Sequence, residues 1–135
     1  MAHILLVEDE PDTRYALAQV LSSVGHKVVE ADSAAGASEL LAERDVDLLV
    51  CELQLANDQA MHILAEARQR TPRLDTIVIC GGGYARSARN NVAAARTLGA
   101  AAILQKPFDS DTLIAVADNL LEEHRDRHLE PAAPG

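Results

Sequence analysis

Aromatic residues are scarce in this 135-residue sequence, at 2% of the chain, and tryptophan is absent. Any core must therefore be aliphatic, and hydrophobic residues still make up 48% of the sequence. Basic residues are also few: 12 Lys and Arg face 21 Asp and Glu, which gives a net charge of -9. Broad nucleic-acid and anionic-membrane surfaces need a positive potential. We therefore expect neither nucleic acid nor a membrane as a partner.

Cysteine is nearly absent too, because the chain holds only Cys51 and Cys80. Both lie in apolar runs, which favours buried reduced thiols over a secreted disulfide framework. A Cys51–Cys80 disulfide is the less favoured alternative. No apolar run approaches the roughly 20 residues of a membrane span. The opening MAHILLVEDE has neither a basic region nor a cleavage site, so we expect cytoplasmic residence.

Short apolar runs alternate with amphipathic stretches along the chain. The runs are short and rich in aliphatic residues, as strands are, whereas the stretches between them repeat apolar residues at a spacing of three to four, as helices do. Five such β-then-α units predict an α/β fold with a doubly wound parallel sheet, because parallel strands need crossover connections. The five predicted strands are 3–7, 27–31, 47–51, 76–80 and 101–105.

The predicted helices carry recognisable start and stop signals. Pro11 suits a first helical turn and Ser33 an N-cap, whereas Gly25 and Gly99 suit helix ends. The last helix is predicted to begin near Asp109. We expect one domain over residues 1–122, with the end of the last helix and a disordered tail over 123–135.

Acidic residues follow two of the predicted strands. Glu8 and Asp9 follow the first and Glu52 the third, and Lys106 follows the fifth. Ligands of open α/β sheets bind at the carboxyl ends of the strands, so these side chains are expected on one edge. Clustered carboxylates need a cation, which predicts either Mg²⁺ or Lys106 among them. The alternative has equal weight: Glu8 and Asp9 end a strand and cap the helix near Pro11.

Three motifs resemble the receiver domains of response regulators in two-component signalling. ILLVEDEP resembles the family's first strand with its acid pair, DLLVCELQLA its third strand with the phosphoacceptor, and LGAAAILQKPF its fifth strand with the Lys-Pro pair. The resemblance covers residues 3 to 122. It implies a flavodoxin-like sheet of order 2-1-3-4-5, with five helices in three α/β/α layers. It also implies phosphoryl transfer from a histidine kinase to the third strand.

The resemblance assigns a role to individual positions. Glu8, Asp9 and the backbone carbonyl of Gln54 would hold Mg²⁺, and Lys106 would neutralise the phosphoryl group. Five positions depart from the family pattern. Glu52 stands at the acceptor aspartate, Cys80 at the switch hydroxyl, Ile103 at the switch aromatic, and Ala56 and Ala60 at a usual proline and glycine.

These departures predict poor phosphotransfer. Glutamate moves the carboxylate outward by one methylene, and misplacement on that scale costs about 10²-fold where positioning matters. A thiol is a weak hydrogen-bond donor, so Cys80 would hold a phosphoryl oxygen poorly. Isoleucine has no aromatic ring, so Ile103 could not reorient as the family's switch residue does. We therefore expect a stand-alone receiver-like signalling module that is not an enzyme, binds Mg²⁺ weakly, and contacts a protein partner through its fourth-helix to fifth-strand face. The partner would be a histidine kinase, a separate output protein or a second copy.

Two other functions stay open from the sequence. The first is a slow or conventional Mg²⁺-dependent phosphoacceptor in a histidine-kinase phosphorelay. The second, ranked last, is a small-molecule or nucleotide sensor that uses the glycine run in CGGGYARSARNN, because a lone glycine run is weak evidence for phosphate binding. Arg86, Arg89 and Arg96 beside this run are expected to be solvated. The five histidines are scattered, and His124 and His128 are expected at the surface.

Overall fold

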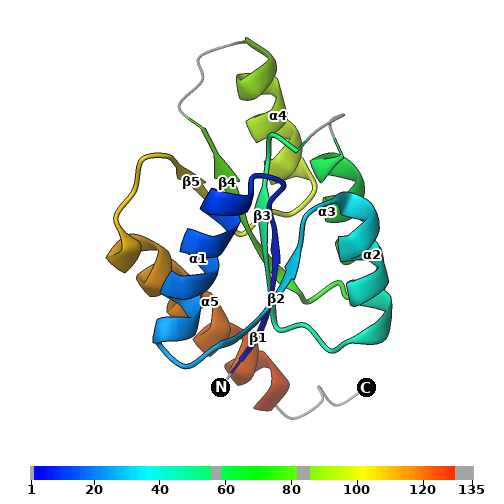
Figure 1. The fold of residues 1–135 in the computed structure, drawn as a ribbon. Coiled ribbons are helices and arrows are strands. Elements are labelled where there is room, and N and C mark those ends of the chain that lie inside the picture. The colour runs from blue at the N-terminus through cyan, green and yellow to red at the C-terminus, as the bar shows by residue number, and fades with distance from the viewer. Residues whose placement is uncertain (1, 56–58, 82–85, 130–135) are drawn as a thin grey trace.

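The computed structural model describes residues 2–55, 59–81 and 86–129. In these residues one parallel sheet of five strands has the order β2-β1-β3-β4-β5. The predicted doubly wound fold and its strand order are confirmed, and Figure 1 shows the strands between helices on both sides. The elements are β1 (His3–Val7), α1 (Pro11–Ser23), β2 (Lys27–Ala31), α2 (Ala34–Glu43), β3 (Leu48–Glu52), α3 (Ala60–Arg70), β4 (Asp75–Cys80), α4 (Arg86–Thr97), β5 (Ala102–Gln105) and α5 (Ser110–Leu129).

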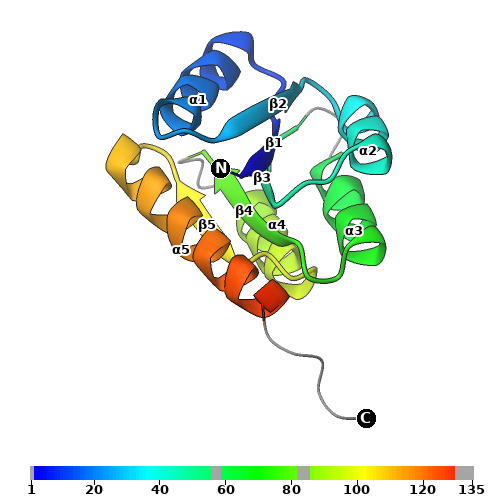
Figure 2. The same ribbon diagram turned by 90° about the horizontal axis from the view of Figure 1, so that it is seen from below.

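The sheet separates two aliphatic cores. Helices α1 and α5 cover one face and α2, α3 and α4 cover the other, as the view from below shows (Figure 2). On the first face, Leu21 and Leu113 are fully buried against Ile4 and Leu6 of β1. Strand β3 is buried along its whole length because it is central and both of its faces are covered. This explains the unbroken apolar run that precedes Glu52.

The helix boundaries follow local chemistry, with one correction. Pro11 opens α1, but its N-cap is Glu10, whose carboxylate accepts the N–H groups of Asp12 and Thr13 at 3.1 and 2.6 Å. The alternative in which Glu8 and Asp9 cap this helix is therefore wrong. An N-cap side chain accepts a hydrogen bond from the second or third N–H group of the helix. The carboxylate of Glu10 reaches both groups.

The other predicted helix signals are confirmed. Ser33 caps α2 by accepting the Gly36 N–H at 3.1 Å. Gly25 and Gly99 have φ values of 94° and 93°, which favour glycine after a helix. Helix α5 begins at Ser110, next to the predicted Asp109.

Strand boundaries differ from the prediction by one residue at most. β3 runs from Leu48 to Glu52, so the glutamate is the last residue of the strand and does not follow it. β4 begins one residue early at Asp75 and β5 one residue late at Ala102. Cys51 and Cys80 are buried free thiols, as expected, and the Cys51–Cys80 disulfide is not formed.

Candidate functional site

The sheet register brings charged side chains to the carboxyl ends of the strands. Val7 of β1 pairs with Cys51 of β3, so the next residues, Glu8 and Glu52, reach the same level. Lys106 follows β5, and its backbone N–H donates to the Cys80 carbonyl at 2.8 Å. We call this edge, formed by Glu8, Glu52, Gln54, Cys80, Gly81 and Lys106, the rim. It lies at the top of the sheet in Figure 1.

A lysine bridges two buried carboxylates on the rim. The ammonium Nζ of Lys106 lies 2.8 Å from Oε2 of Glu52 and 3.4 Å from Oε1 of Glu8. The glutamates are 5% and 1% exposed, whereas the lysine side chain is 33% exposed. Two buried carboxylates of like charge repel, and a shared cation relieves that repulsion. Lys106 is therefore the counter-ion of the rim.

The titration of the rim reflects this packing. Burial raises the pKa of Glu8, the charge of Glu52 raises it further, and the charge of Lys106 opposes both. Burial lowers the pKa of Lys106, but the hydrogen bond and charge of Glu52 outweigh it, so the pKa is raised overall. Lys106 is consequently charged at neutral pH.

The Glu52 carboxylate also accepts a hydrogen bond from the segment that follows β3. The backbone N–H of Gln54 donates to Glu52 Oε1 at 3.2 Å, and the Gly81 N–H donates to the side-chain Oε1 of Gln54 at 3.2 Å. Each oxygen of the Glu52 carboxylate thus faces a positive or donor group. From the sequence, Gln54 is expected to act only through its backbone carbonyl, because spacing does not show that its side chain reaches Gly81 after the neighbouring strand β4.

Cys80 and Ile103 are the two residues that the sequence assigns to the family's switch positions. Cys80 is 7% exposed, and burial, followed by the charge of Glu52, raises the pKa of its thiol. A neutral thiol is a weak donor. Ile103 is partly buried and packs against the core cluster that contains Cys80. The roles assigned to both positions stay predictions.

The metal ligands expected from the sequence are two acidic side chains, Glu8 and Asp9, and the backbone carbonyl of Gln54. Carboxylate oxygens suit Mg²⁺. However, no group of three or more His, Cys, Asp and Glu side chains in the described residues could hold a metal ion. The Lys106 ammonium already lies against the two buried carboxylates, and Asp9 is exposed. The weak Mg²⁺ binding expected from the sequence stays a prediction.

Comparison with known proteins agrees with these motifs. The family model described as the response regulator receiver domain matches residues 4–118. The chain belongs to this family. The receiver is 33% identical over 122 residues to the transcriptional regulatory protein GlrR of Escherichia coli K12, which covers 90% of the chain but 27% of that protein. It therefore spans about a quarter of the length of the curated relatives that it matches.

Solved structures support the same assignment. The crystal structure of the receiver domain of NtrX from Brucella abortus is 32% identical, with a TM-score of 0.79 over 88% of this chain and 98% of that one. A CheY-like receiver from Methanospirillum hungatei JF-1 has a TM-score of 0.85 at 22% identity, which bears on the fold alone. The receiver is thus a signalling domain of the two-component type.

Parts of the sequence prediction fall outside the described residues. Ala56 and residues 82–85 of the glycine-rich loop are among these, and the side chains of Arg86 and Arg89 are not described. Arg96 is exposed in the last turn of α4, as expected. Within the described residues, no helix is long and apolar enough to cross a bilayer.

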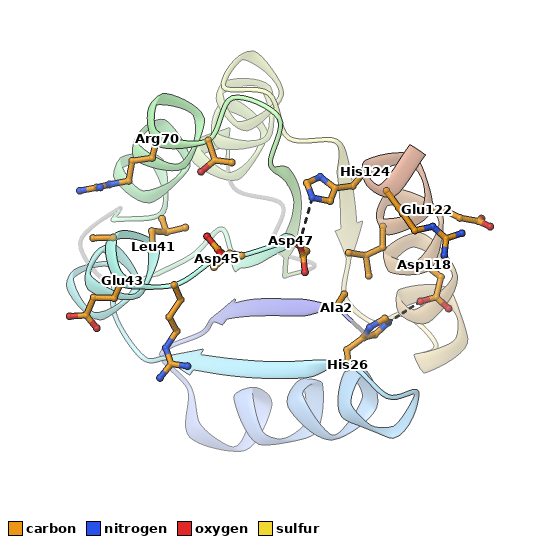
Figure 3. Close-up of a pocket in the computed structure, with 16 residues that line it drawn as sticks. Ala2, His26, Leu41, Glu43, Asp45, Asp47, Arg70, Asp118, Glu122 and His124 are labelled. Carbon is orange, nitrogen blue, oxygen red and sulfur yellow. Dashed lines mark hydrogen bonds and ion pairs between the residues drawn. The ribbon is translucent and has the colours of Figure 1, made fainter. Parts of the chain in front are cut away.

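His124 is a second point on which the sequence prediction was wrong. His124 is 8% exposed, and its Nε2 lies 3.6 Å from Asp47 Oδ1. His26 Nε2 lies 3.0 Å from Asp118 Oδ1. Both pairs border a cavity of about 1150 Å³ at the amino end of the sheet, opposite the rim (Figure 3). His124 was expected at the surface because four-residue spacing does not show which face of a long helix is covered.

Asp47 connects three segments at this end of the receiver. Its Oδ2 accepts the backbone N–H of His3 at 2.9 Å, and its Oδ1 faces His124. We expect Asp47→Ala to lower the free energy of unfolding by about 1.5 kcal/mol, the lower end for a hydrogen bond to a charged group, because the Asp47 side chain is partly exposed. Denaturant unfolding followed by circular dichroism measures it. The exposed neighbour provides the control, because Asp45→Ala should change stability by about 0.5 kcal/mol at most. If Asp47→Ala and the wild type unfold at the same denaturant concentration, the contacts of Asp47 do not contribute to stability.

Arg14 also contributes to the rim and was not found from the sequence. Its Nη1 donates to the Glu8 carbonyl at 3.0 Å, and its Nε lies 3.4 Å from Glu30 Oε1. The arginine thus anchors the backbone of the first rim residue to α1. An arginine on an amphipathic helix is ordinarily solvated, so nothing in the sequence distinguishes this one.

Proposed function

We propose that this receiver signals by binding a protein partner without efficient phosphoryl transfer. The observation that carries the proposal is the pairing of Glu52, which lies at the acceptor position. One of its carboxylate oxygens lies 2.8 Å from Lys106 and the other accepts the Gln54 N–H. Both oxygens therefore face groups of the protein itself, and the carboxylate would have to give up its ion pair with Lys106 to turn toward a phosphoryl donor.

The side-chain chemistry of the rim supports the same conclusion. Glutamate carries its carboxylate one methylene beyond the position of an aspartate, and reactions that depend on positioning are sensitive to about 1 Å. The longer chain also brings negative charge toward the lysine, as a phosphoryl group would. The receiver would then be held in one signalling state, whether active or inactive.

The partner is proposed from the family to which the receiver belongs. The relatives are named as transcriptional and nitrogen-assimilation regulators, and the chain corresponds to about a quarter of their length. We infer a protein partner, either a histidine kinase or an output protein, on the α4 and β5 face in the cytoplasm. In this reading the receiver is a binding module and not an enzyme. Association with a second copy through the same face would be seen as a dimer by light scattering.

A slow phosphoacceptor is the second candidate function. It is favoured by the acid pair Glu8 and Asp9 and by Lys106, which are all retained at matching positions. In this reading Glu52 would accept a phosphoryl group, and Glu8, Asp9 and the Gln54 carbonyl would hold the Mg²⁺ that offsets its charge. The two candidates differ in the mass of the protein after exposure to a phosphoryl donor.

Intact-mass spectrometry tests the proposal directly. The wild-type receiver is incubated with Mg²⁺ and an acyl-phosphate donor, and we expect no mass gain of one phosphoryl group. Glu52→Gln serves as the control, because it cannot accept the group at this position. A gain in the wild type that is lost in Glu52→Gln would establish the phosphoacceptor and overturn the proposal.

A further inference from the structure

Gln54 contacts two parts of the rim at once. Its backbone N–H donates to Glu52 Oε1 and its side-chain Oε1 accepts the Gly81 N–H, both at 3.2 Å. Residues 54 and 81 follow the neighbouring strands β3 and β4 and are 27 apart in the sequence. One glutamine therefore joins the acceptor-position carboxylate to the end of β4.

Gly81 permits this contact because it has no side chain. A Cβ at residue 81 would lie 2.7 Å from Gln54 Oε1 and 3.7 Å from its Cδ. The closer distance is too short for any real Cβ contact, so one group would have to move. The obstructing atom is the end of a flexible side chain, and therefore Gly81→Ala would displace the glutamine and leave the backbone in place.

The Gly81 N–H is one of three donors that an anion on the rim could use. Backbone N–H groups in turns bind anions, as do lysine ammonium groups. In this receiver Gln54 Oε1 takes the Gly81 N–H, Glu52 Oε1 takes the Gln54 N–H, and Glu52 and Glu8 take the Lys106 ammonium. Each of these donors therefore already has an acceptor from the chain itself.

We propose that Gln54 is the positioning residue that couples Glu52 to the end of β4 and to the start of α4. Gly81 directly follows β4, and the next described element along the chain is α4, which begins at Arg86. The inference rests on the proposed function, because it supplies a coupling that the thiol of Cys80 and the aliphatic Ile103 do not supply. The hydrogen bond from the Gly81 N–H to Gln54 Oε1 would supply this coupling in place of a hydroxyl at residue 80.

Amide exchange with water, measured by NMR, tests the coupling. The Gly81 amide should exchange about tenfold faster in Gln54→Ala, and the residue 81 amide equally fast in Gly81→Ala, because each variant removes the same hydrogen bond. The amide signals of Ala93–Thr97 in α4 should shift in both variants. Gln54→Glu keeps an acceptor oxygen at the same reach and should preserve the slow exchange. Gln69→Ala, on the exposed end of α3, is the matched control and should change neither signal.

Two results would overturn the inference. One is slow Gly81 exchange that persists in Gln54→Ala, which would show that the glutamine does not hold this amide. The other is fast exchange with unshifted α4 signals, which would show that the bond is local. Exchange is measured without a phosphoryl donor, so labelling of the wild type would contradict the proposed function and leave the result for Gln54 standing.

Discussion

Glu52→Asp is expected to label with an acyl-phosphate donor at least about 10²-fold faster than the wild-type receiver. Removing one methylene withdraws the carboxylate from Lys106, whose Nζ lies 2.8 Å from the glutamate in the wild type. The shorter side chain frees an oxygen for attack, while Glu8 still holds the lysine at 3.4 Å. The rate of mass gain in intact-mass spectrometry, with Mg²⁺ present, measures the effect.

Two further variants make this prediction specific. Glu52→Gln should not label, because an amide is not a nucleophile of this kind. Adding Cys80→Thr to Glu52→Asp should raise the rate about tenfold more, since a hydroxyl donates a stronger hydrogen bond to a charged oxygen than a thiol does. If Glu52→Asp labels no faster than the wild type, the length of the Glu52 side chain is not what limits the reaction.

The fold and the positions of the rim residues could be read from the sequence. The apolar runs have a period and length typical of covered parallel strands, and turn residues such as Gly25 and Gly99 have conformations that few other residues adopt. Because the strands are parallel, their carboxyl ends share one edge. This is why Glu8, Glu52, Cys80 and Lys106 could be placed together before any contact was known.

The contacts made by side chains could not be read in the same way. Lys106 bridges both glutamates, and Gln54 reaches Gly81, because of side-chain directions that only packing determines. Spacing also could not show that α5 turns His124 inward toward Asp47. The sequence predicts which residues share an edge, whereas hydrogen bonds and ion pairs decide which donors are left for a ligand.

Lys106→Met is expected to have the largest effect on stability, about 3 kcal/mol at neutral pH. Breaking a buried ion pair from one side costs about 3–5 kcal/mol, and the lower end applies because the lysine side chain is one-third exposed. The variant leaves the buried carboxylates of Glu8 and Glu52 side by side without their cation. Denaturant unfolding measures the loss. Lys27→Met removes the same charge from the exposed edge strand β2 and should cost about 0.5 kcal/mol or less.

The cost of Lys106→Met should shrink as the pH falls from neutral toward 4.5, the ordinary pKa of a glutamate. Burial already raises the pKa of Glu8 in the wild type, and the charge of Lys106 opposes that rise, so removing the lysine raises this pKa further. A carboxyl whose pKa is higher in the folded state favours folding when it is protonated, and this contribution is lost as the pH rises through the folded-state pKa. Adding Glu8→Gln to the variant should recover part of the stability at neutral pH and flatten its pH dependence. A difference between Lys106→Met and Lys27→Met that stays constant with pH would show that the buried carboxylates do not depend on the lysine for their charge.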